Sequence, residues 1–113
     1  MEIVNDDYAV SYDSETNTIV CSGSFRLTGR EYAAITDILN TAADAKPEVL
    51  NLDLTRLQFL NSSGINTLSK FIIRLRKHKA SQVNVKGNSV FAWQNRSLAN
   101  FKKLLPELVL EFD

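Results

Sequence analysis

The stretch from Leu57 to Leu75 constrains the fold of this chain more than any other. It begins as the end of an apolar strand, passes through the small polar residues Asn61-Ser62-Ser63-Gly64, and then becomes amphipathic. We expect a helix from about Ser63 to His78, because apolar residues recur there at helical spacing. They predict one buried stripe: Ile65, Leu68, Ile72 and Leu75, with Phe71 at its edge. A strand, a turn and a helix in this order place serine hydroxyls and free backbone N–H groups at a helix N-terminus, which suits anionic groups.

Two strands are expected within the first 25 residues. Residues 1–7 are polar and are expected to fray. The alternating pattern of Tyr8–Tyr12 predicts the first strand, and Thr18–Phe25 predicts the second. The turn residues Asp13–Asn17 between them favour a hairpin. Cys21 falls inside the second strand, where we interpret it as a small buried apolar residue and not as a reactive thiol.

A helix pattern follows over Arg30–Ala42, with Thr28 as N-cap and Glu31 completing a capping box. Its apolar stripe consists of Tyr32, Ile35, Ile38, Leu39 and Ala42. Val49–Leu54 then predicts an apolar interior strand that runs parallel to the second strand.

The remaining predicted elements are a strand over Gln82–Lys86, a helix over about Phe91–Leu105 and a last strand over Leu108–Phe112. That helix is expected to bury Leu98, Phe101 and Leu105. The order ββαβαβαβ predicts a single α/β domain over residues 1–113. Its sheet is expected to be mixed, with four or five strands and with helices packed mainly on one face.

Composition limits the function classes. The 113 residues include 13 basic and 13 acidic ones, so net charge favours neither nucleic acid nor an anionic membrane as a partner. No apolar run is long enough to span a bilayer and no secretory signal is recognisable, so a cytoplasmic location is expected. With one cysteine, Cys21, and one histidine, His78, neither an internal disulfide nor a zinc site is predicted. No cofactor is predicted either, and the chain is expected to be a monomer or a weak dimer.

The outer face of the predicted helix from Ser63 to His78 is basic. At about 100° per residue, this face gathers Ser63, Asn66, Lys70, Ile73, Arg74 and Lys77. Ile73 is an aliphatic residue far from the predicted core stripe. The combination suits a protein-binding surface, and a solvated face with one stray apolar residue explains the same pattern.

The strand end, the Asn61–Gly64 turn and the basic helix resemble the STAS domain of bacterial anti-sigma-factor antagonists. In that family an aliphatic or aromatic strand end leads into Asp-Ser-[Ser/Thr]-Gly, then an aliphatic residue and a helix. The order of predicted elements over residues 8–112 also matches, so the resemblance covers nearly the whole chain. It implies a STAS-like α/β fold and a regulatory protein-binding module of a partner-switching system, not an enzyme.

The resemblance also implies how the switch works. An anti-sigma factor that is a serine kinase would phosphorylate the residue immediately before the glycine, which is Ser63 here, with Ser62 as the alternative. Phosphorylation would release the partner, and a phosphatase would restore binding. Gly64 would permit close approach of the partner's backbone. Together with the basic helix face described above, this gives the expected partner-binding residues: Arg26, Asn61, Ser62, Gly64, Asn66, Lys70, Ile73, Arg74 and Lys77.

Two positions depart from the family pattern. Asn61 stands where the family has Asp; it keeps the shape and can still cap the helix, but it carries no charge. After the second strand the family commonly shows Gly-x-Leu-Asp, whereas this chain has Gly23-Ser24-Phe25-Arg26. Both changes make the site more positive.

Other interpretations stay open. Ser62 and Ser63 also suit a helix cap and a first helical turn without any modification. A serine hydrolase would need a base, but the one histidine, His78, lies a full helix away and no Gly-x-Ser-x-Gly motif is present. A STAS-like module without phosphorylation would serve as an assembly subunit or a lipid-transport accessory protein. Trp93 fits either the core or an interface anchor.

Overall fold

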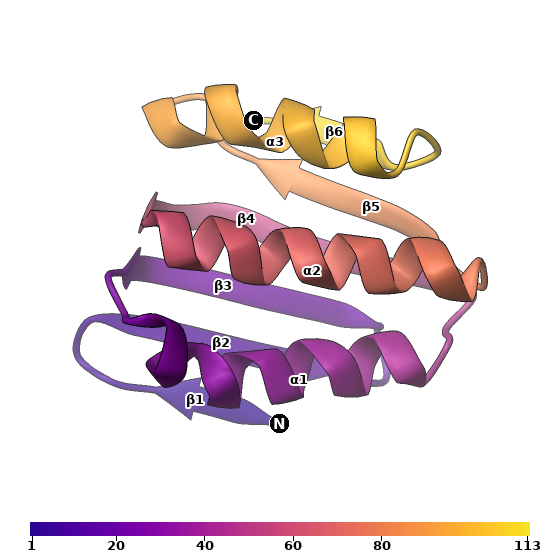
Figure 1. Cartoon of the computed structure of the whole chain (residues 1–113), viewed down its shortest axis with the longest axis horizontal. Helices are drawn as coiled ribbons and strands as arrows, with labels where there is room; N and C mark the ends of the chain where they lie inside the picture. Colours follow the sequence, from indigo (N-terminus) through magenta and orange to yellow (C-terminus); the bar gives the residue numbers. More distant parts are fainter.

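In the computed structural model, which describes residues 1–113, six strands form one mixed sheet in sequence order, β1-β2-β3-β4-β5-β6 (Figure 1). The strands are β1 Glu2–Val4, β2 Tyr8–Asp13, β3 Thr18–Phe25, β4 Val49–Leu60, β5 Gln82–Gly87 and β6 Val109–Phe112. The helices are the 3-10 helix η1 Gly29–Tyr32, and α1 Ala33–Asp44, α2 Ser62–His78 and α3 Ala92–Leu104. The pairs β1–β2 and β2–β3 are antiparallel. The pairs β3–β4, β4–β5 and β5–β6 are parallel, which confirms the predicted parallel pairing of the second and third strands.

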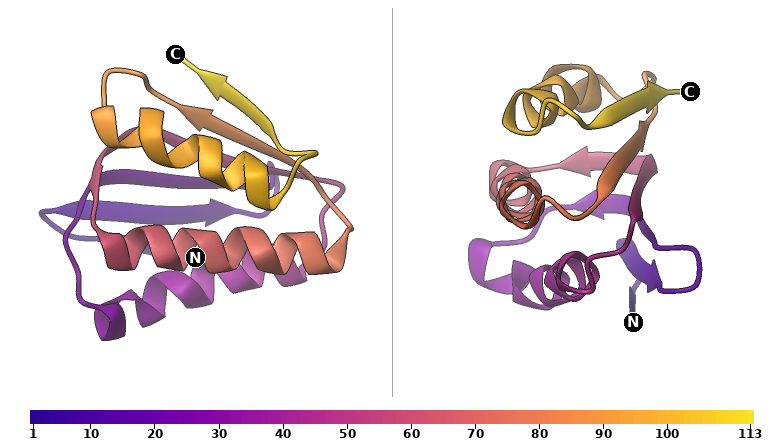
Figure 2. Two further views of the ribbon diagram at one scale, coloured as in Figure 1. Left: turned by 45° about the horizontal axis from the view of Figure 1, so that its top comes forward. Right: turned by 90° about the vertical axis from the view of Figure 1, so that its right-hand side faces the viewer.

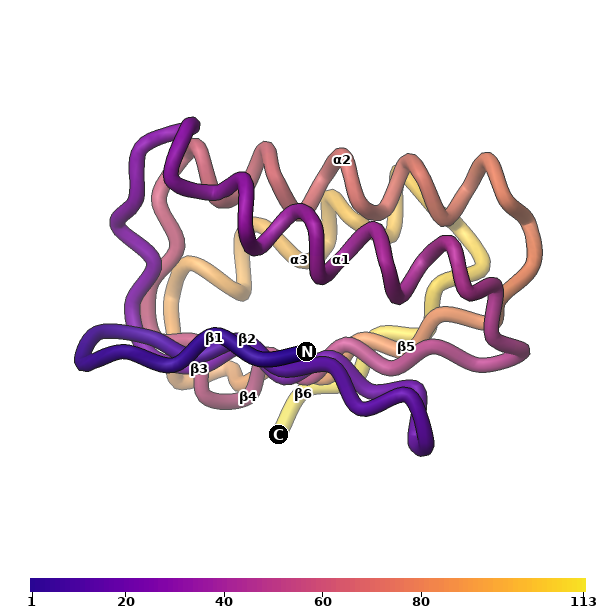
Figure 3. The backbone as a smooth tube through the Cα atoms, turned by 90° about the horizontal axis from the view of Figure 1, so that it is seen from below, coloured from indigo at the N-terminus to yellow at the C-terminus, as the bar shows by residue number.

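All three α-helices cover one face of the sheet, and the other face carries no helix (Figures 2 and 3). Each of them connects two neighbouring parallel strands, and every connection steps in the same direction along the sheet. Because such crossovers are right-handed, they place their helices on the same face. The α/β class and the one-sided helix layer that the sequence predicts are therefore confirmed.

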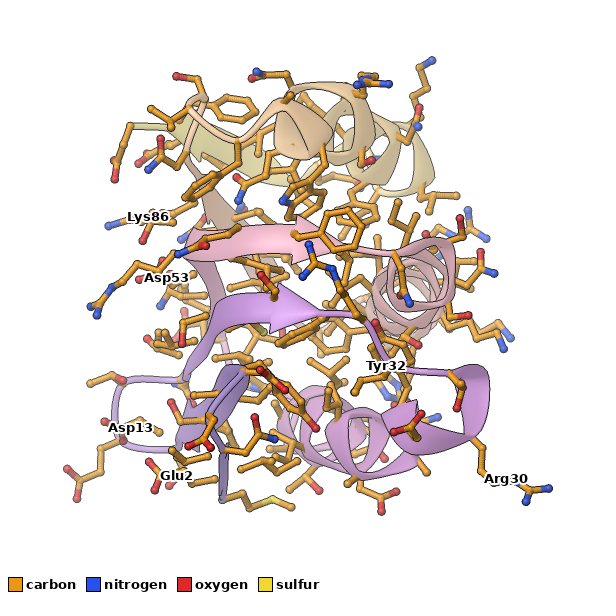
Figure 4. The ribbon with its side chains drawn as sticks, turned by 90° about the vertical axis from the view of Figure 1, so that its left-hand side faces the viewer. Glu2, Asp13, Arg30, Tyr32, Asp53 and Lys86 are labelled. Carbon is orange, nitrogen blue, oxygen red and sulfur yellow. The ribbon has the colours of Figure 1, made fainter.

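The core lies between the sheet and the helices and contains 24 buried hydrophobic residues in one cluster. In β4, Leu50, Leu52 and Leu54 are buried, and the residues between them are polar. Figure 4 shows Asp53 and its neighbour in the register, Lys86, projecting from the helix-free face. Since successive side chains of a strand point to opposite faces, this alternation gives the sheet one apolar and one polar face. The polar face explains why the sheet needs no second layer of helices.

Cys21 is fully buried in β3. Burial raises the pKa of its thiol to about 12, and the carboxylate of Asp53 acts in the same direction. The thiol is therefore protonated at neutral pH and inaccessible, which confirms its interpretation as a small buried apolar residue.

The predicted number of four or five strands is wrong, because the sheet has six. The additional strand is β1, which lies within residues 1–7 that were expected to fray. It pairs with β2, and Ile3 packs against the core. Asn5 builds the connecting turn, since its Oδ1 accepts hydrogen bonds from the backbone N–H groups of Asp7 at 2.9 Å and Tyr8 at 3.0 Å. This Asx turn fixes a hairpin that the polar composition concealed.

Some element boundaries also differ from the prediction. β4 continues to Leu60 instead of ending at Leu54, so the strand runs directly into the polar turn. The start of the first predicted helix is the 3-10 helix η1. The predicted capping box is present there: Glu31 Oε1 accepts hydrogen bonds from the backbone N–H of Thr28 at 3.1 Å and from its hydroxyl at 2.8 Å.

The predicted buried faces of α2 and α3 are largely confirmed. The residues buried as predicted are Leu68, Ile72, Leu75, Leu98 and Phe101. Ile65 and Leu105 are only half-buried, which corrects the prediction for both. Ile65 lies in the first turn of α2, where it lines a groove at the surface. Phe71, expected at the edge of the stripe, is only 2% exposed, and Leu108 is buried after α3.

Leu68 is 2% exposed on the sheet side of α2. We expect Leu68→Ala to lower the free energy of unfolding by about 2–5 kcal/mol, because the change removes most of a large side chain from a packed site. Urea denaturation followed by circular dichroism measures this difference. A change below about 0.5 kcal/mol, typical of surface substitutions, would contradict the core position of Leu68.

Candidate functional site

The turn between β4 and α2 is held by the side chain of Asn61. Asn61 is the N-cap of α2, and its Oδ1 accepts hydrogen bonds from the backbone N–H of Gly64 at 3.0 Å and from the hydroxyl of Tyr32 at 2.6 Å. Its Nδ2–H donates to the carbonyl oxygen of Leu27 at 2.7 Å. Tyr32, labelled in Figure 4, comes from η1, and partial burial raises the pKa of its hydroxyl, so that it remains a donor. Hydrogen bonds of Asn61 thus join the turn to Tyr32 in η1 and to the backbone of Leu27.

These bonds explain why asparagine stands at position 61. Both halves of the amide are used, the oxygen as an acceptor and the nitrogen as a donor to Leu27. A carboxylate would place an oxygen against the carbonyl oxygen of Leu27, where it has no hydrogen to donate. Asn61 caps the helix as the sequence predicts, and its polar atoms are engaged inside the protein instead of being offered to a partner.

Ser62 and Ser63 are the first two residues of α2. Ser62 is exposed and Ser63 is half-buried. Neither hydroxyl makes a hydrogen bond within the protein, and the Asn61 side chain caps Gly64 but not the two serine N–H groups. The hydroxyls are therefore available at a helix N-terminus, where the dipole favours negative charge.

Gly64 has a packing role inside the protein. It is buried, and a Cβ added to it would lie 2.2 Å from Leu60 Cδ1 and 2.6 Å from the hydroxyl oxygen of Tyr32. The space that glycine leaves is thus filled from inside the protein, and the close approach of a partner's backbone at Gly64 stays a prediction. A side chain here would push against Leu60 and disturb the hydrogen bond between Tyr32 and Asn61.

Arg26 lies on the same edge of the sheet as this turn. It follows the end of β3, and the last residues of β3 and β4 are neighbours in the register, Phe25 beside Leu60. The Arg26 guanidinium carbon is 4.6 Å from the centre of the Phe59 ring, which is 37% exposed. This cation–π contact places a positive charge close to the serine turn.

The outer face of α2 is less open than predicted. Asn66, Lys70 and Lys77 are exposed, but Ile73 is half-buried. Arg74 retains 42% of its side-chain exposure, yet its Nε and Nη2 donate to the Asp44 carboxylate at 2.8 and 2.7 Å. The face expected to be free is thus partly engaged with the end of α1.

His78 contacts the same carboxylate as Arg74, and these two residues and Asp44 form the Asp44 cluster. The Nε2 of His78 lies 2.9 Å from Asp44 Oδ1. It ends α2, whereas Ser62 begins it, and a helix of this length separates the two by about 24 Å at 1.5 Å per residue. A histidine base for either serine is therefore not assembled, and the arrangement of a serine hydrolase does not form.

The Asp44 cluster should make stability depend on pH. Hydrogen bonds from Arg74 and His78 hold the pKa of the Asp44 carboxyl well below its usual range. A carboxyl whose pKa is lower in the folded state stabilises the fold at pH values above its unfolded-state pKa of about 3.9. This stabilisation is lost as the pH falls below that value. We expect Asp44→Asn to melt below the wild type at pH 7 and the difference to shrink below about pH 4. A pH-independent difference between the two melting temperatures would contradict this origin.

Sequence reasoning missed Gln94, which is fully buried in the first turn of α3. Its Nε2–H donates to the carbonyl oxygens of Leu54 at 2.7 Å and Leu57 at 3.0 Å, and its Oε1 accepts from the backbone N–H of Asn88 at 2.7 Å. The indole Nε1–H of Trp93 donates to the same Leu57 carbonyl at 3.0 Å. Trp93 is half-buried, so it joins the core on one side and the surface on the other.

These contacts close an open edge of β4. β5 pairs with β4 only as far as Asp53, whereas β3 follows β4 to Leu60. Beyond Asp53, side chains of α3 and the loop before it take the place of a neighbouring strand. The strand that leads into the serine turn therefore depends on α3.

No protein-family model and no curated protein sequence matches this chain. Several solved structures do match this chain. A chain in the crystal structure of the diguanylate cyclase SiaD in complex with its activator SiaC, from Pseudomonas aeruginosa, superposes with a TM-score of 0.75 at 14% identity, over 100% of this chain and 99% of that one. Apo-SiaC from the same organism gives 0.66 at 16% identity, over 100% and 97% of the two chains.

An anti-sigma factor antagonist from Mycobacterium paratuberculosis gives a TM-score of 0.67 at 20% identity, over 94% of this chain and 88% of that chain. At these identities the likeness establishes the fold. The chain therefore has the STAS-like fold of anti-sigma factor antagonists that the sequence resemblance implies. No helix is long and apolar enough to cross a membrane, and no group of three potential metal-ligating side chains is present.

Proposed function

We propose that this protein is a regulatory protein-binding module of a bacterial partner-switching system, controlled by reversible phosphorylation of Ser63, with Ser62 as the alternative acceptor. One observation carries the proposal: two serine hydroxyls without internal partners lie at the N-terminus of α2, on a turn that Asn61 and Tyr32 hold in place. The fold shared with an anti-sigma factor antagonist and with SiaC supports it.

The choice between the two serines rests on different arguments. Ser63 occupies the position directly before Gly64 that the family resemblance indicates, but it is half-buried. Ser62 is the more exposed of the two. A kinase that reaches Ser63 would have to draw its side chain outward, whereas Ser62 is accessible as it stands.

The proposed partners are a serine kinase resembling an anti-sigma factor and a phosphatase. The complex of SiaC with the cyclase that it activates adds an enzyme as a further class of target. In each case the unmodified module binds its target, and the phosphate releases it, because a doubly charged group beside the contact must be desolvated.

Incubation with ATP and candidate serine kinases from the source organism, followed by phosphosite mass spectrometry, tests this function. We expect phosphate on Ser63, and Ser63→Ala and Ser62→Ala separate the two acceptors. Partner capture with wild type and Ser63→Asp then shows whether the charge releases the target. Absence of phosphate from both serines in native protein, under all growth conditions, would favour an unmodified assembly or lipid-transport accessory subunit.

The outer face of α2 provides a second test. Ile73 is half-buried and does not belong to the core cluster. Ile73→Glu should leave the chain folded and should weaken partner binding by roughly tenfold, if the partner covers this face. Isothermal titration with the captured partner measures the affinity, and Lys103→Glu on α3 is the exposed control. Unchanged affinity would remove the α2 face from the interface.

A further inference from the structure

A groove opens beside the serine turn, between the end of β4 and the start of α3. Its large apolar lining residues are Phe59, Ile65 and Trp93, and its volume is about 430 Å³, within the range of ligand-binding clefts. Phe59 is 37% exposed, and the other two side chains are half-buried. The hydrogen bond from the Trp93 indole to Leu57 fixes one wall. The groove thus presents apolar surface on a rigid frame.

The surroundings of this groove are positive. Arg96 lines it, Arg26 stacks on the Phe59 ring, and no acidic residue contributes to its lining. Two helix N-termini meet there, since Ile65 lies in the first turn of α2 and Ala92 begins α3. Neither helix has an acidic residue in its first turn, so no side-chain carboxylate offsets the positive ends of the two dipoles.

We propose that this groove binds an acidic segment of the partner protein, which inserts one large apolar side chain between Phe59 and Trp93. The apolar walls would contact the inserted side chain. Arg26, Arg96 and the two helix N-termini would attract carboxylates on either side of it. The net charge of the whole chain is zero, so the expected preference for acidic segments is local to this groove.

This inference rests on the proposed function, because it assigns the partner's contact to the phosphorylation turn. Ser62 and Ser63 stand between Phe59 and Ile65 in the sequence, and both of these residues line the groove. A phosphate on either serine adds about −1.5 to −2 charges beside the site of an acidic segment. Repulsion between like charges then gives the direction of the switch: the phosphorylated module releases its partner.

Selection of short random peptides displayed on phage, with the unmodified full chain as bait, tests the groove. We expect the enriched peptides to combine Asp or Glu with a large apolar residue. Synthetic copies without Trp should shift the fluorescence of Trp93, which is the one tryptophan of the chain. Their affinity should fall at high salt, because exposed charges are screened.

Matched variants locate the binding. Arg96→Glu should weaken the selected peptides by about tenfold or more, and Phe59→Ala should do the same. Arg30→Glu makes the same charge change at an exposed residue that does not line the groove and that projects into solvent (Figure 4), and it should alter affinity by less than about twofold. Circular dichroism confirms that each variant is folded.

Three results would contradict the proposal that the groove binds an acidic segment. They are enriched peptides without acidic residues, unchanged Trp93 fluorescence, and equal effects of Arg96→Glu and Arg30→Glu on peptide affinity. If phosphorylation still releases the natural partner in that case, the proposed function stands and only the groove is rejected. If peptides bind as expected but neither serine is phosphorylated in native protein, the groove stands and the switch is rejected.

Discussion

Replacing Gln94 with leucine is expected to lower the free energy of unfolding by about 2–6 kcal/mol, because the Leu54 carbonyl and the Asn88 N–H lose their partner and each such buried group costs about 1–3 kcal/mol. The side chain is fully buried and serves the carbonyl oxygens of Leu54 and Leu57 and the backbone N–H of Asn88. Leucine has a similar size, so the loss measures hydrogen bonding and not a cavity. Urea denaturation at neutral pH is the measurement.

The neighbouring residue provides the control for this experiment. Asn95 carries a similar amide but is exposed, and its Nδ2–H donates to the Ser89 carbonyl at 3.0 Å. Asn95→Leu should therefore cost less than about 1 kcal/mol. Gln94→Glu keeps the shape but turns a donor toward two carbonyl oxygens into an acceptor, so it should be at least as harmful as leucine. Equal losses for Gln94→Leu and Asn95→Leu would mean that the buried amide does not support β4.

Phosphorylation of Ser63 is expected to weaken partner binding by about 100-fold, or roughly 3 kcal/mol, while leaving the fold intact. Inside the protein, the free N–H groups at the start of α2 and the helix dipole receive the added charge. At the interface the same phosphate would have to be desolvated, and acidic groups of the partner would repel it. Affinity and stability should thus respond differently to one modification.

Titration and melting of enzymatically phosphorylated protein separate these two effects. Ser63→Ala, which cannot be modified there, should bind with and without kinase treatment, and Ser62→Ala shows whether the neighbouring hydroxyl substitutes. A melting temperature far below that of the unmodified protein would place the effect on folding. Undiminished affinity of the phosphoprotein would rule out the switch.

The helix faces could be predicted from the sequence because they follow a local rule. Leu68, Ile72 and Leu75 recur at helical spacing, and they pack against the sheet as this spacing requires. Ile65 obeys the same periodicity but lies in the first turn, beside a groove and not beneath the next layer of side chains. Periodicity therefore identifies the side of the helix but not how far the core extends along it.

The hydrogen-bonded contacts at the site could not be predicted, because they join distant residues. Gln94 meets the Leu54 carbonyl across 40 positions of sequence, and Tyr32 meets Asn61 across 29. In the sequence, Gln94 is one polar residue in a polar helix start, and nothing nearby indicates that it is buried. The position of Asn61 before a helix does predict a cap, but not the donor function of its amide toward Leu27, 34 positions away.

The attachment of α3 to β4 has a consequence for motion. Beyond Asp53, only β3 pairs with β4, and the opposite edge is closed by Gln94 and Trp93. A fluctuation that lifts α3 must therefore also free the strand that carries the serine turn. Native-state hydrogen exchange should detect α3 and the last residues of β4 opening together, at a lower free energy than the centre of the sheet. A molecule that binds α3 would thus reduce the motion of the serine turn without contacting a serine.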